Sequence, residues 1–367
     1  MGFDSFLGNS KAVEAVRGFL KSGRAPGALL FTGPDGVGKK TLALMFAKAL
    51  NCERRPGGTD FCGECPRCRK ADEMIASTQE DLTRRREIKD ASRRVEGLVY
   101  FDLQLIEPIT RFILIEQIRQ LRAVAYTRPF ELPQRVFVVD QAQTIHWQAI
   151  DLLLKILEEP PETTNLILVC SNAFELRPTI RSRCVRVPFQ PLDDAQIRDL
   201  VVREGRVPKA HQELAVRIAA GSVTAARNFD VGEFEHRRQP WLDFLGAVCR
   251  PGPAASDLNW RALFDSTKAL AEKRDEFETT LRTGYILLRD LEILQEIGAE
   301  GRVANIDILP HLKTWAPQLG FRGLERFKEA LDQAFRLQVR NVNQQLGLET
   351  LAVNLTESRA AAKPRPR

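Results

Sequence analysis

The chain has 367 residues, 44% of them hydrophobic and 28% charged, with a formal net charge of +6. This composition is that of a folded protein with two or three domains, and it excludes a largely disordered chain. Apolar runs stay well below the roughly 20 residues that span a bilayer, and the first residues lack a secretory signal pattern, so we expect a cytoplasmic protein without membrane contacts.

The first predicted element is an amphipathic helix at 10–23, which ends at Gly23. Its apolar face is made of Ala12, Val13, Val16, Phe19 and Leu20. A short apolar strand, GALLFTG at 27–33, comes next, and TLALMFAKALNC at 41–52 has helical spacing. A glycine-rich loop joins these two segments, so the predicted order is strand, loop, helix.

Further strands are predicted at 135–140 (RVFVVD) and 165–171 (NLILVCS), with a helix at 148–159 between them. Apolar strands that alternate with helices are typical of a parallel sheet covered on both faces. The first half is therefore predicted to be an α/β domain. The charged stretch at 83–97 favours a solvated helix or surface insertion over a nucleic-acid patch, because no aromatic residues are interleaved there.

The loop GPDGVGKKT at 33–41 has most of the spacing of a phosphate-binding loop. Such a loop needs glycines that let backbone N–H groups surround phosphate, a lysine for the β and γ phosphates, and a hydroxyl for Mg²⁺. Gly33, Gly36, Gly38 and Lys39 meet the first two requirements, and Lys40 stands where the hydroxyl should be. Thr41 comes one residue late, which on a helix means a rotation of about 100°. The loop therefore predicts a nucleotide-binding ancestry, and nucleotide binding itself is left open.

Polar residues follow the two later strands. Asp140 ends the strand at 135–140, where an NTPase places a carboxylate for Mg²⁺, but its neighbour Gln141 cannot act as a base. Ser171 and Asn172 follow the strand at 165–171, where they could orient a phosphate or water, or could simply be turn residues. The candidate nucleotide-binding residues are Gly33, Gly36, Gly38, Lys39, Lys40, Thr41, Asp140 and Asn172.

Four of the seven cysteines lie close together in NCERRPGGTDFCGECPRC. Cys52, Cys62, Cys65 and Cys68 include two Cys-x-x-Cys steps, a spacing that lets tight turns direct four sulfurs at one tetrahedral Zn²⁺. With four protein ligands, no position remains for a reactive water, so the predicted zinc is structural. Redox chemistry or unpaired thiols are the alternatives, and the other three cysteines are interpreted as packing residues.

These segments together resemble the bacterial clamp-loader branch of the AAA+ ATPases. The resemblance rests on the loop and its helix, the inserted cysteines, LLLKILEEPPETTNLILVCSNAFELRPTIRSRC at 152–184, and NVNQQLGLETLAVNL at 341–355. It implies an AAA+ nucleotide-binding-type domain at 1–190, with the zinc module at 52–68. It also implies a helical lid at 191–235 and an all-α collar at 238–356 that joins subunits, while the tail at 357–367 is predicted to be disordered.

In that family, Arg183 would match the arginine that enters the ATP site of a neighbouring subunit, an arginine finger supplied in trans. The alternative is an ordinary surface ion pair or a strand cap. An ATP-hydrolysing motor subunit would carry Ser or Thr at position 40, Glu at 141 and Arg at 224, and this chain has Lys40, Gln141 and Thr224. The departures favour a subunit that donates its arginine without hydrolysing ATP.

The resemblance also implies partners. We expect a hetero-oligomeric ring with the gamma/tau and delta subunits of the DNA polymerase III clamp loader, which loads the sliding clamp onto primer–template DNA. The expected cofactors are structural Zn²⁺ and, as an open question, ATP. Two other functions remain as alternatives, an ATP-hydrolysing motor of the gamma/tau type and a zinc-containing nucleic-acid-binding module.

Overall fold

The computed structural model describes residues 2–249, 260–272, 276–338, 345–350 and 352–353. The chain divides into two compact units. The first comprises Met1–Gln196 with Gly221–Thr224, and the second comprises Ile197–Ala220 with Ala225–Arg367. The predicted disordered tail at 357–367 and seven of the fifteen residues of the motif at 341–355 lie outside the described residues.

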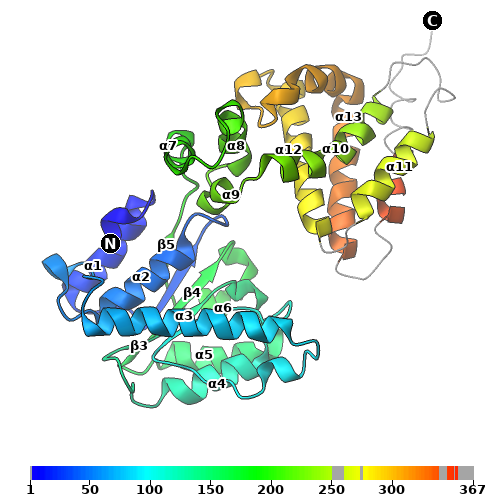
Figure 1. Ribbon diagram of the computed structural model, residues 1–367. Helices are drawn as coiled ribbons and strands as arrows, with labels where there is room; N and C mark the ends of the chain where they lie inside the picture. The colour runs from blue at the N-terminus through cyan, green and yellow to red at the C-terminus, as the bar shows by residue number, and fades with distance from the viewer. Residues whose placement is uncertain (1, 250–259, 273–275, 339–344, 351, 354–367) are drawn as a thin grey trace, which may run out of the picture. The chain divides into compact units, whose positions relative to one another are not determined.

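The first unit is built on a parallel sheet of five strands, in the order β2-β3-β4-β1-β5 (Figure 1). The strands are β1 (Ala28–Thr32), β2 (Leu103–Ile106), β3 (Arg135–Val139), β4 (Thr164–Cys170) and β5 (Val185–Pro188). All four neighbouring pairs run parallel, which confirms the predicted sheet. We name the edge at which the strands end the carboxyl edge, and the edge at which they begin the amino edge.

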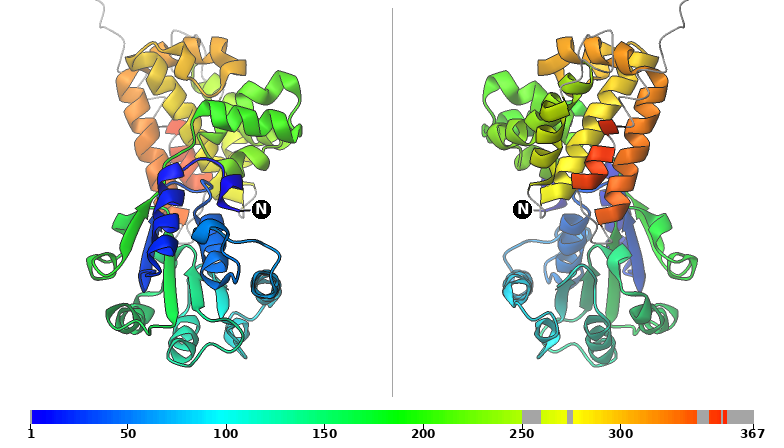
Figure 2. Two further views of the ribbon diagram at one scale, coloured as in Figure 1. Left: turned by 90° about the vertical axis from the view of Figure 1, so that its left-hand side faces the viewer. Right: turned by 90° about the vertical axis from the view of Figure 1, so that its right-hand side faces the viewer.

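Different helices cover the two faces of the sheet (Figure 2). On one face, alternate strand residues such as Leu30 and Phe137 pack with apolar residues of α4 (Ile115–Ala125) and α5 (Ile150–Glu158). On the other face, α2 (Lys39–Asn51) contacts β1, β3 and β4. Because both faces are buried, the inner strands are apolar except at their ends, and apolar and polar residues do not alternate along them.

Three helices complete this unit. The predicted first helix is α1 (Ser10–Ser22), and Gly23 ends it with a φ of 66°, a left-handed conformation that glycine adopts readily. The other two are α6 (Pro178–Arg181) and α3 (Pro66–Glu87), which contacts α2 and β2.

The sequence analysis missed both α3 and β2. The buried positions of α3 recur every three or four residues, from Cys68 to Arg85, but they include Thr78 and Arg85 and are therefore not a simple apolar stripe. β2 has only four residues and includes the polar Gln104. Both elements are held by packing against their neighbours, which hydrophobic periodicity does not reveal.

The described residues beyond the first unit are mostly helical, as predicted. Three short helices come first, α7 (Asp194–Glu204), α8 (Gln212–Ala219) and α9 (Val223–Arg227), followed by α10 (Val231–Val248), α11 (Trp260–Ala271), α12 (Phe277–Glu296) and α13 (Leu309–Gln338). Within the predicted all-α collar at 238–356, α11 ends at Ala271 and α12 begins at Phe277. α13 contains a break at Gly320, where φ is 60°.

The core of the second unit surrounds Trp241, which is fully buried. Its indole Nε1 donates to the carbonyl oxygen of Thr280 at 2.8 Å, so the polar atom of the ring is satisfied. Its ring also lies against Gly284 of α12, where an added Cβ would meet the ring at 2.7 Å. Within the described residues, no helix combines the length and apolar character needed to cross a membrane.

Candidate functional site

The phosphate-type loop joins β1 to α2 at the carboxyl edge of the sheet. Its three glycines, Gly33, Gly36 and Gly38, have φ angles of 146°, 75° and 95°. A Cβ on Gly36 would lie 2.0 Å from the Ser222 hydroxyl oxygen, and a Cβ on Gly38 would lie 2.7 Å from the Phe6 ring. Groups of the protein itself therefore approach the loop as closely as only glycine permits.

Lys39 begins α2, and its side chain folds back onto the loop. Its Nζ donates to the carbonyl oxygens of Gly33 at 2.6 Å and Pro34 at 2.5 Å, and the side chain is only 6% exposed. Burial lowers the pKa of Lys39 below its ordinary value, and the carboxylate of Asp35, 3.8 Å away, partly offsets this effect. The ammonium that would reach a phosphate is thus bonded to loop carbonyls.

Lys40 points to the ends of the two strands beside α2. Its Nζ lies 2.8 Å from Glu107 Oε1 and 3.3 Å from Asp140 Oδ2. The second oxygen of Glu107, Oε2, accepts from Arg86 Nη2 at 2.7 Å. We refer to Lys40, Arg86, Glu107 and Asp140 as the Lys40 cluster.

The Lys40 cluster shifts the pKa values of its members in different directions. Burial alone would lower the pKa of Lys40, but its bonds to Glu107 and Asp140 outweigh burial and raise it. Burial alone would raise the pKa of Glu107, but Lys40 and Arg86 together lower it. The pKa of Asp140 is raised by burial, which its contact with Lys40 only partly opposes. Glu107 is therefore the more firmly ionised carboxylate of the two.

The sequence analysis missed Glu107 and Arg86. Glu107 directly follows β2, and Ile106 pairs with Val139 in the sheet, so Glu107 and Asp140 leave adjacent strands at the same level. A carboxylate after the apolar run LQLI was the available signal, but it depended on recognising β2. Arg86 lies in the last turn of α3 and had no signal of its own.

The remaining predicted nucleotide-site residues have structural environments of their own. Thr41 is exposed on α2. Asn172 Oδ1 accepts from the backbone N–H of Phe174 at 3.0 Å, which is a capping bond of a turn. Ser171 Oγ accepts from Gln143 Nε2 at 3.2 Å. All of them lie at the carboxyl edge, near the point between β1 and β4 where the connections diverge and where open α/β sheets bind ligands.

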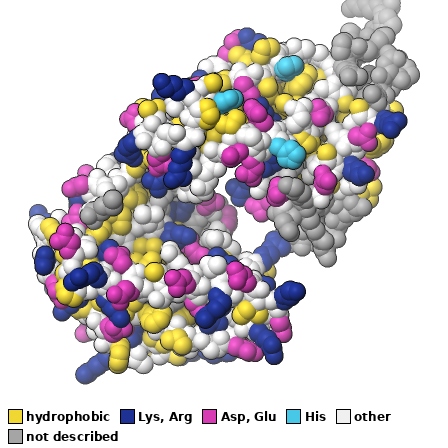
Figure 3. Space-filling model, viewed as in Figure 1, with side chains coloured by type: hydrophobic (Ala, Val, Ile, Leu, Met, Phe, Trp, Pro, Cys, Tyr) yellow, Lys and Arg dark blue, Asp and Glu magenta, His cyan; other side chains and the backbone are white. Residues whose placement is uncertain are grey.

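The charged stretch at 83–97 binds its own backbone. Arg85 is buried and donates to the carbonyl oxygens of Arg94 at 2.9 Å, Glu96 at 2.8 Å and Gly97 at 3.1 Å. Arg94 in turn donates to the carbonyl oxygen of Ile88 at 2.6 Å. On the face drawn in Figure 3, basic and acidic side chains are interspersed rather than separated. These contacts favour the structural alternative for this stretch.

The four predicted zinc ligands converge at the other end of α2. The sulfur atoms of Cys52, Cys62, Cys65 and Cys68 lie within 4.8 Å of one another, with the Cys52–Cys62 pair at 3.7 Å and the Cys62–Cys68 pair at 4.0 Å. Four sulfurs placed about 2.3 Å from one Zn²⁺ in a tetrahedron are about 3.8 Å apart. The donor set and its spacing therefore fit a single tetrahedral metal ion.

Backbone N–H groups surround these sulfurs. The N–H of Cys65 donates to Cys62 Sγ at 3.3 Å, and the N–H of Cys68 donates to Cys65 Sγ at 3.4 Å. Burial alone would raise the pKa of the Cys65 thiol, but hydrogen bonds from the backbone and from neighbouring thiols lower it to about 6. Burial raises the pKa of Cys68. A thiolate at Cys65 is thus available near neutral pH, which is the form that binds metal.

The cysteine cluster connects three segments. Cys52 follows the last residue of α2, and Cys65 caps the first turn of α3. Phe61, between them, packs edge-to-face on the buried Phe3 at 5.7 Å, and Asp60 accepts from the Phe3 N–H at 3.0 Å. Closing the cluster around a metal would therefore hold the chain start, α2 and α3 together.

Arg183 lies at the opposite edge of the sheet from the loop. It lies two residues before β5, whose first residue Val185 is level with Leu29, near the start of β1. Its Nη2 pairs with Glu158 Oε1 at 2.7 Å, its Nη1 donates to the Thr179 carbonyl oxygen at 2.9 Å, and its side chain is 35% exposed. The five residues of β1 span roughly 13 Å, so Arg183 and the loop of its own chain lie at different edges.

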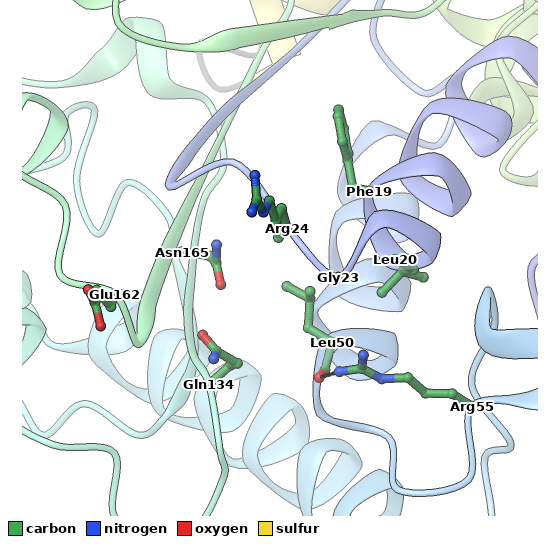
Figure 4. A pocket seen from close by; sticks show the side chains of 10 residues that line it. Phe19, Leu20, Gly23, Arg24, Leu50, Arg55, Gln134, Glu162 and Asn165 are labelled. Atoms are coloured by element: carbon green, nitrogen blue, oxygen red, sulfur yellow. Dashed lines mark hydrogen bonds between the residues drawn. The ribbon is translucent and has the colours of Figure 1, made fainter.

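A pocket of about 580 Å³ also lies at the amino edge (Figure 4). It is lined by residues at the ends of α1 and α2 and at the starts of β3 and β4, including Leu20, Leu50, Gln134 and Asn165. Asn165 Nδ2 donates to the carbonyl oxygen of Pro26 at 3.1 Å, so this polar residue ties neighbouring segments together. The pocket is separate from the Lys40 cluster, which lies at the carboxyl edge.

Comparison with known proteins identifies the family. Residues 8–193 match the family model described as DNA polymerase III, delta subunit. The chain belongs to this family. The delta′ subunit of DNA polymerase III from Bacillus subtilis is 26% identical over 351 residues, which are 95% of this chain and 96% of that protein. The family predicted from the motifs is confirmed.

Gamma/tau proteins are also similar to part of this chain. The tau subunit from Escherichia coli is 30% identical over 230 residues, and the tau/gamma subunit from Haemophilus influenzae is 30% identical over 195 residues. These matches cover 61% and 53% of this chain, which spans only 32% and 25% of the length of the two relatives. The similarity therefore leaves most of the gamma/tau sequence without a counterpart here.

Two solved structures resemble the chain more distantly. A gamma subunit-related protein of DNA polymerase III from Thermotoga maritima has a TM-score of 0.44 at 17% identity, covering 95% of this chain and 99% of that one. The RuvB branch migration motor of the same organism has a TM-score of 0.40 at 14% identity, covering 85% and 88%. Both scores are too low to bear on function.

Proposed function

We propose that the chain acts as a delta′-type subunit of a DNA polymerase III clamp loader and donates Arg183 to the ATP site of a neighbouring subunit. The observation that carries the proposal is the position of Arg183, at the amino edge, away from the loop of its own chain and partly exposed. An arginine there can act on a nucleotide only if that nucleotide belongs to another chain. The B. subtilis delta′ relative, similar over nearly its full length, supports this choice.

The contacts of Arg183 fix its guanidinium in position and leave it accessible to another molecule. Glu158 and the Thr179 carbonyl oxygen fix the guanidinium without burying it. A fixed guanidinium can stabilise the charge that develops on a transferring phosphoryl group. Because two partners already hold the Arg183 guanidinium, it needs little further ordering in the transition state. Arg183 thus contributes charge and position, and no covalent chemistry.

The chain's own loop is not equipped for hydrolysis. Lys40 replaces the hydroxyl that would bind Mg²⁺, and Gln141 replaces the carboxylate that would activate water. The proposed partners are the gamma/tau and delta subunits, in a ring that loads the sliding clamp onto primer–template DNA in the cytoplasm. The helical region at 238–356 would be the collar that joins the subunits, and 191–235 would be the lid.

We further propose that the cysteine cluster binds one structural Zn²⁺. Cys52, Cys62, Cys65 and Cys68 would fill all four positions of the ion as thiolates. Their task would be to hold α2, α3 and the chain start in place, and not to take part in a reaction.

The test is ATP hydrolysis by a clamp loader reconstituted with gamma/tau and delta subunits, clamp and primed DNA. Arg183→Ala should slow ATP hydrolysis at the neighbouring site about a thousandfold. The total hydrolysis rate of the assembled complex should therefore fall by the fraction that this site contributes. Arg181→Ala is the matched control, because Arg181 lies two residues before Arg183, at the end of α6, and its guanidinium lies over the Phe174 ring at 5.0 Å. Equal rates for Arg183→Ala and wild type would rule out the proposed role.

The second candidate is an ATP-hydrolysing motor of the gamma/tau type, which the 30% identity over 230 residues favours. It predicts steady ATP turnover by the isolated chain that Lys39→Ala abolishes. The delta′ proposal predicts no turnover by the isolated chain.

A further inference from the structure

The position of the Lys40 ammonium carries an inference about the loop itself. Lys40 occupies the second residue of α2, where a nucleotide-hydrolysing loop would direct a hydroxyl at a divalent cation. Its Nζ lies between Glu107 Oε1, at 2.8 Å, and Asp140 Oδ2, at 3.3 Å. Glu107 and Asp140 leave the carboxyl ends of the neighbouring strands β2 and β3. The ammonium thus takes the place that a cation between these strand ends would have.

The charges around this position are balanced. Arg86 Nη2 bonds Glu107 Oε2 at 2.7 Å, so the Lys40 cluster contains two carboxylates and two permanent cations. Glu107 and Asp140 are 10% and 14% exposed, whereas the Lys40 side chain is 42% exposed and reaches them from the solvent side. A divalent cation would have to displace the ammonium, and because Arg86 stays bonded to Glu107, the site would then offer it only one excess negative charge. The residues present therefore do not fit Mg²⁺.

We propose that Lys40 is the built-in cation of this loop, which neutralises Glu107 and Asp140 in place of a divalent metal ion. As a consequence, any nucleotide that the loop accepts is bound without Mg²⁺. Lys40 is the cation that bridges the two carboxylates, and Glu107 and Asp140 would otherwise offer two of the oxygen ligands that Mg²⁺ prefers. This inference concerns the chain's own loop and stands whether or not Arg183 acts on a neighbouring subunit.

The test exchanges Lys40 for the hydroxyl residue that a metal-dependent loop would carry. ATP binding to the purified full chain is measured by calorimetry with and without added Mg²⁺, and chelators are avoided because they would also attack the cysteine cluster. For Lys40→Thr we expect ATP affinity to rise about tenfold or more on adding Mg²⁺, and for wild type no rise above about twofold. Binding of Mn²⁺ alone, followed by electron paramagnetic resonance, gives a second readout that needs no nucleotide.

Two control variants define the cause. Lys40→Arg keeps a cation at this position and should gain neither the Mg²⁺ response nor Mn²⁺ binding. Lys40→Thr combined with Asp140→Asn should lose both gains, because one of the two carboxylates is gone. Circular dichroism and the thermal unfolding midpoint establish that each variant is folded.

Three results would overturn the proposal. The first is wild-type binding of ATP that Mg²⁺ strengthens about tenfold, because the ammonium would then not exclude the metal. The second is a folded Lys40→Thr chain that responds neither to Mg²⁺ with ATP nor to Mn²⁺ alone. The third is a gain in Lys40→Arg equal to that in Lys40→Thr. None of these measurements involves Arg183 or another subunit, so the outcome is separate from that of the clamp-loader assay.

Discussion

The two ends of α2 handle positive charge in opposite ways. At its N-terminus, two carboxylates from β2 and β3 are neutralised by the protein's own Lys40 and Arg86. At its C-terminus, four sulfurs approach within 4.8 Å of one another, and backbone N–H groups lower the pKa of Cys65 to about 6. At the N-terminus of α2 the protein supplies the cations itself, whereas at the C-terminus it presents four soft sulfur ligands to a metal ion from solution.

The phosphate-type loop at one end of α2 and the cysteine cluster at the other end therefore have different physical requirements. The N-terminal end is complete without any ligand, because side chains of the same chain satisfy each charge. The C-terminal end gathers four thiols that only a shared metal would bring to a common charge state. We therefore expect changes at the C-terminal end to alter metal content, and changes at the N-terminal end to alter stability without altering metal content.

The largest effect is expected for Cys65→Ser. Loss of one thiolate should release the bound zinc and lower the free energy of unfolding by several kcal/mol, below the ~10 kcal/mol or more typical of isolated zinc-binding peptides. Elemental analysis of the purified protein and urea unfolding measure the two effects. Cys184→Ser, outside the cluster, should keep the zinc. Full zinc content in Cys65→Ser would show that Cys65 is not one of the ligands that hold the metal.

The next largest effect is expected for Glu107→Gln. Removing the carboxylate that Lys40 and Arg86 share should cost about 2–3 kcal/mol at neutral pH, less than for a fully buried pair because both cations are partly exposed. Lys40 and Arg86 lower the pKa of Glu107 in the folded chain. The extra free energy of unfolding of wild type over Glu107→Gln is therefore fully present above the pKa of Glu107 in the unfolded chain, about 4.3. It is lost as the pH falls from there through the folded value.

Urea unfolding of both chains at several pH values measures this difference. Glu80→Gln is the control, because Glu80 is exposed on α3 and its change should cost little at any pH. An advantage that stays constant to the lowest pH would mean that ionisation of Glu107 does not stabilise the fold. Zinc content should be the same in all three proteins, in contrast to Cys65→Ser.

The smallest effect is expected for Gly36→Ala. A Cβ at a φ of 75°, 2.0 Å from the movable Ser222 hydroxyl, should cost about 1–2 kcal/mol in the absence of nucleotide. Gly18→Ala in α1 has nothing within 4 Å of the new Cβ and should instead stabilise the chain by about 0.5–1 kcal/mol. Thermal unfolding without ligand compares the two. A neutral Gly36→Ala would mean that the loop keeps its shape for a ligand and not for the protein's own packing.

Particular residues illustrate how far sequence reasoning reached. The strand–loop–helix at 27–52 and the cysteine spacing involve neighbours along the chain, and both were predicted. Asn172 was proposed for the nucleotide site, with a turn residue as the alternative, and the structure gives it a capping bond to Phe174. Glu107 was missed because β2 was not recognised, and Arg86 because it lies in a charged stretch with no apolar period.

The sequence by itself determined the family, the loop and the four-cysteine set, and it singled out Arg183 as a candidate. These features depend on residue type and short spacing, which the linear order records directly. The tertiary structure alone decided that Lys40 meets Glu107, 67 residues away, and that Arg183 and the loop lie at opposite edges of the sheet. The physical reason is that a parallel sheet joins segments distant in sequence, so the strand order chooses which charges become neighbours.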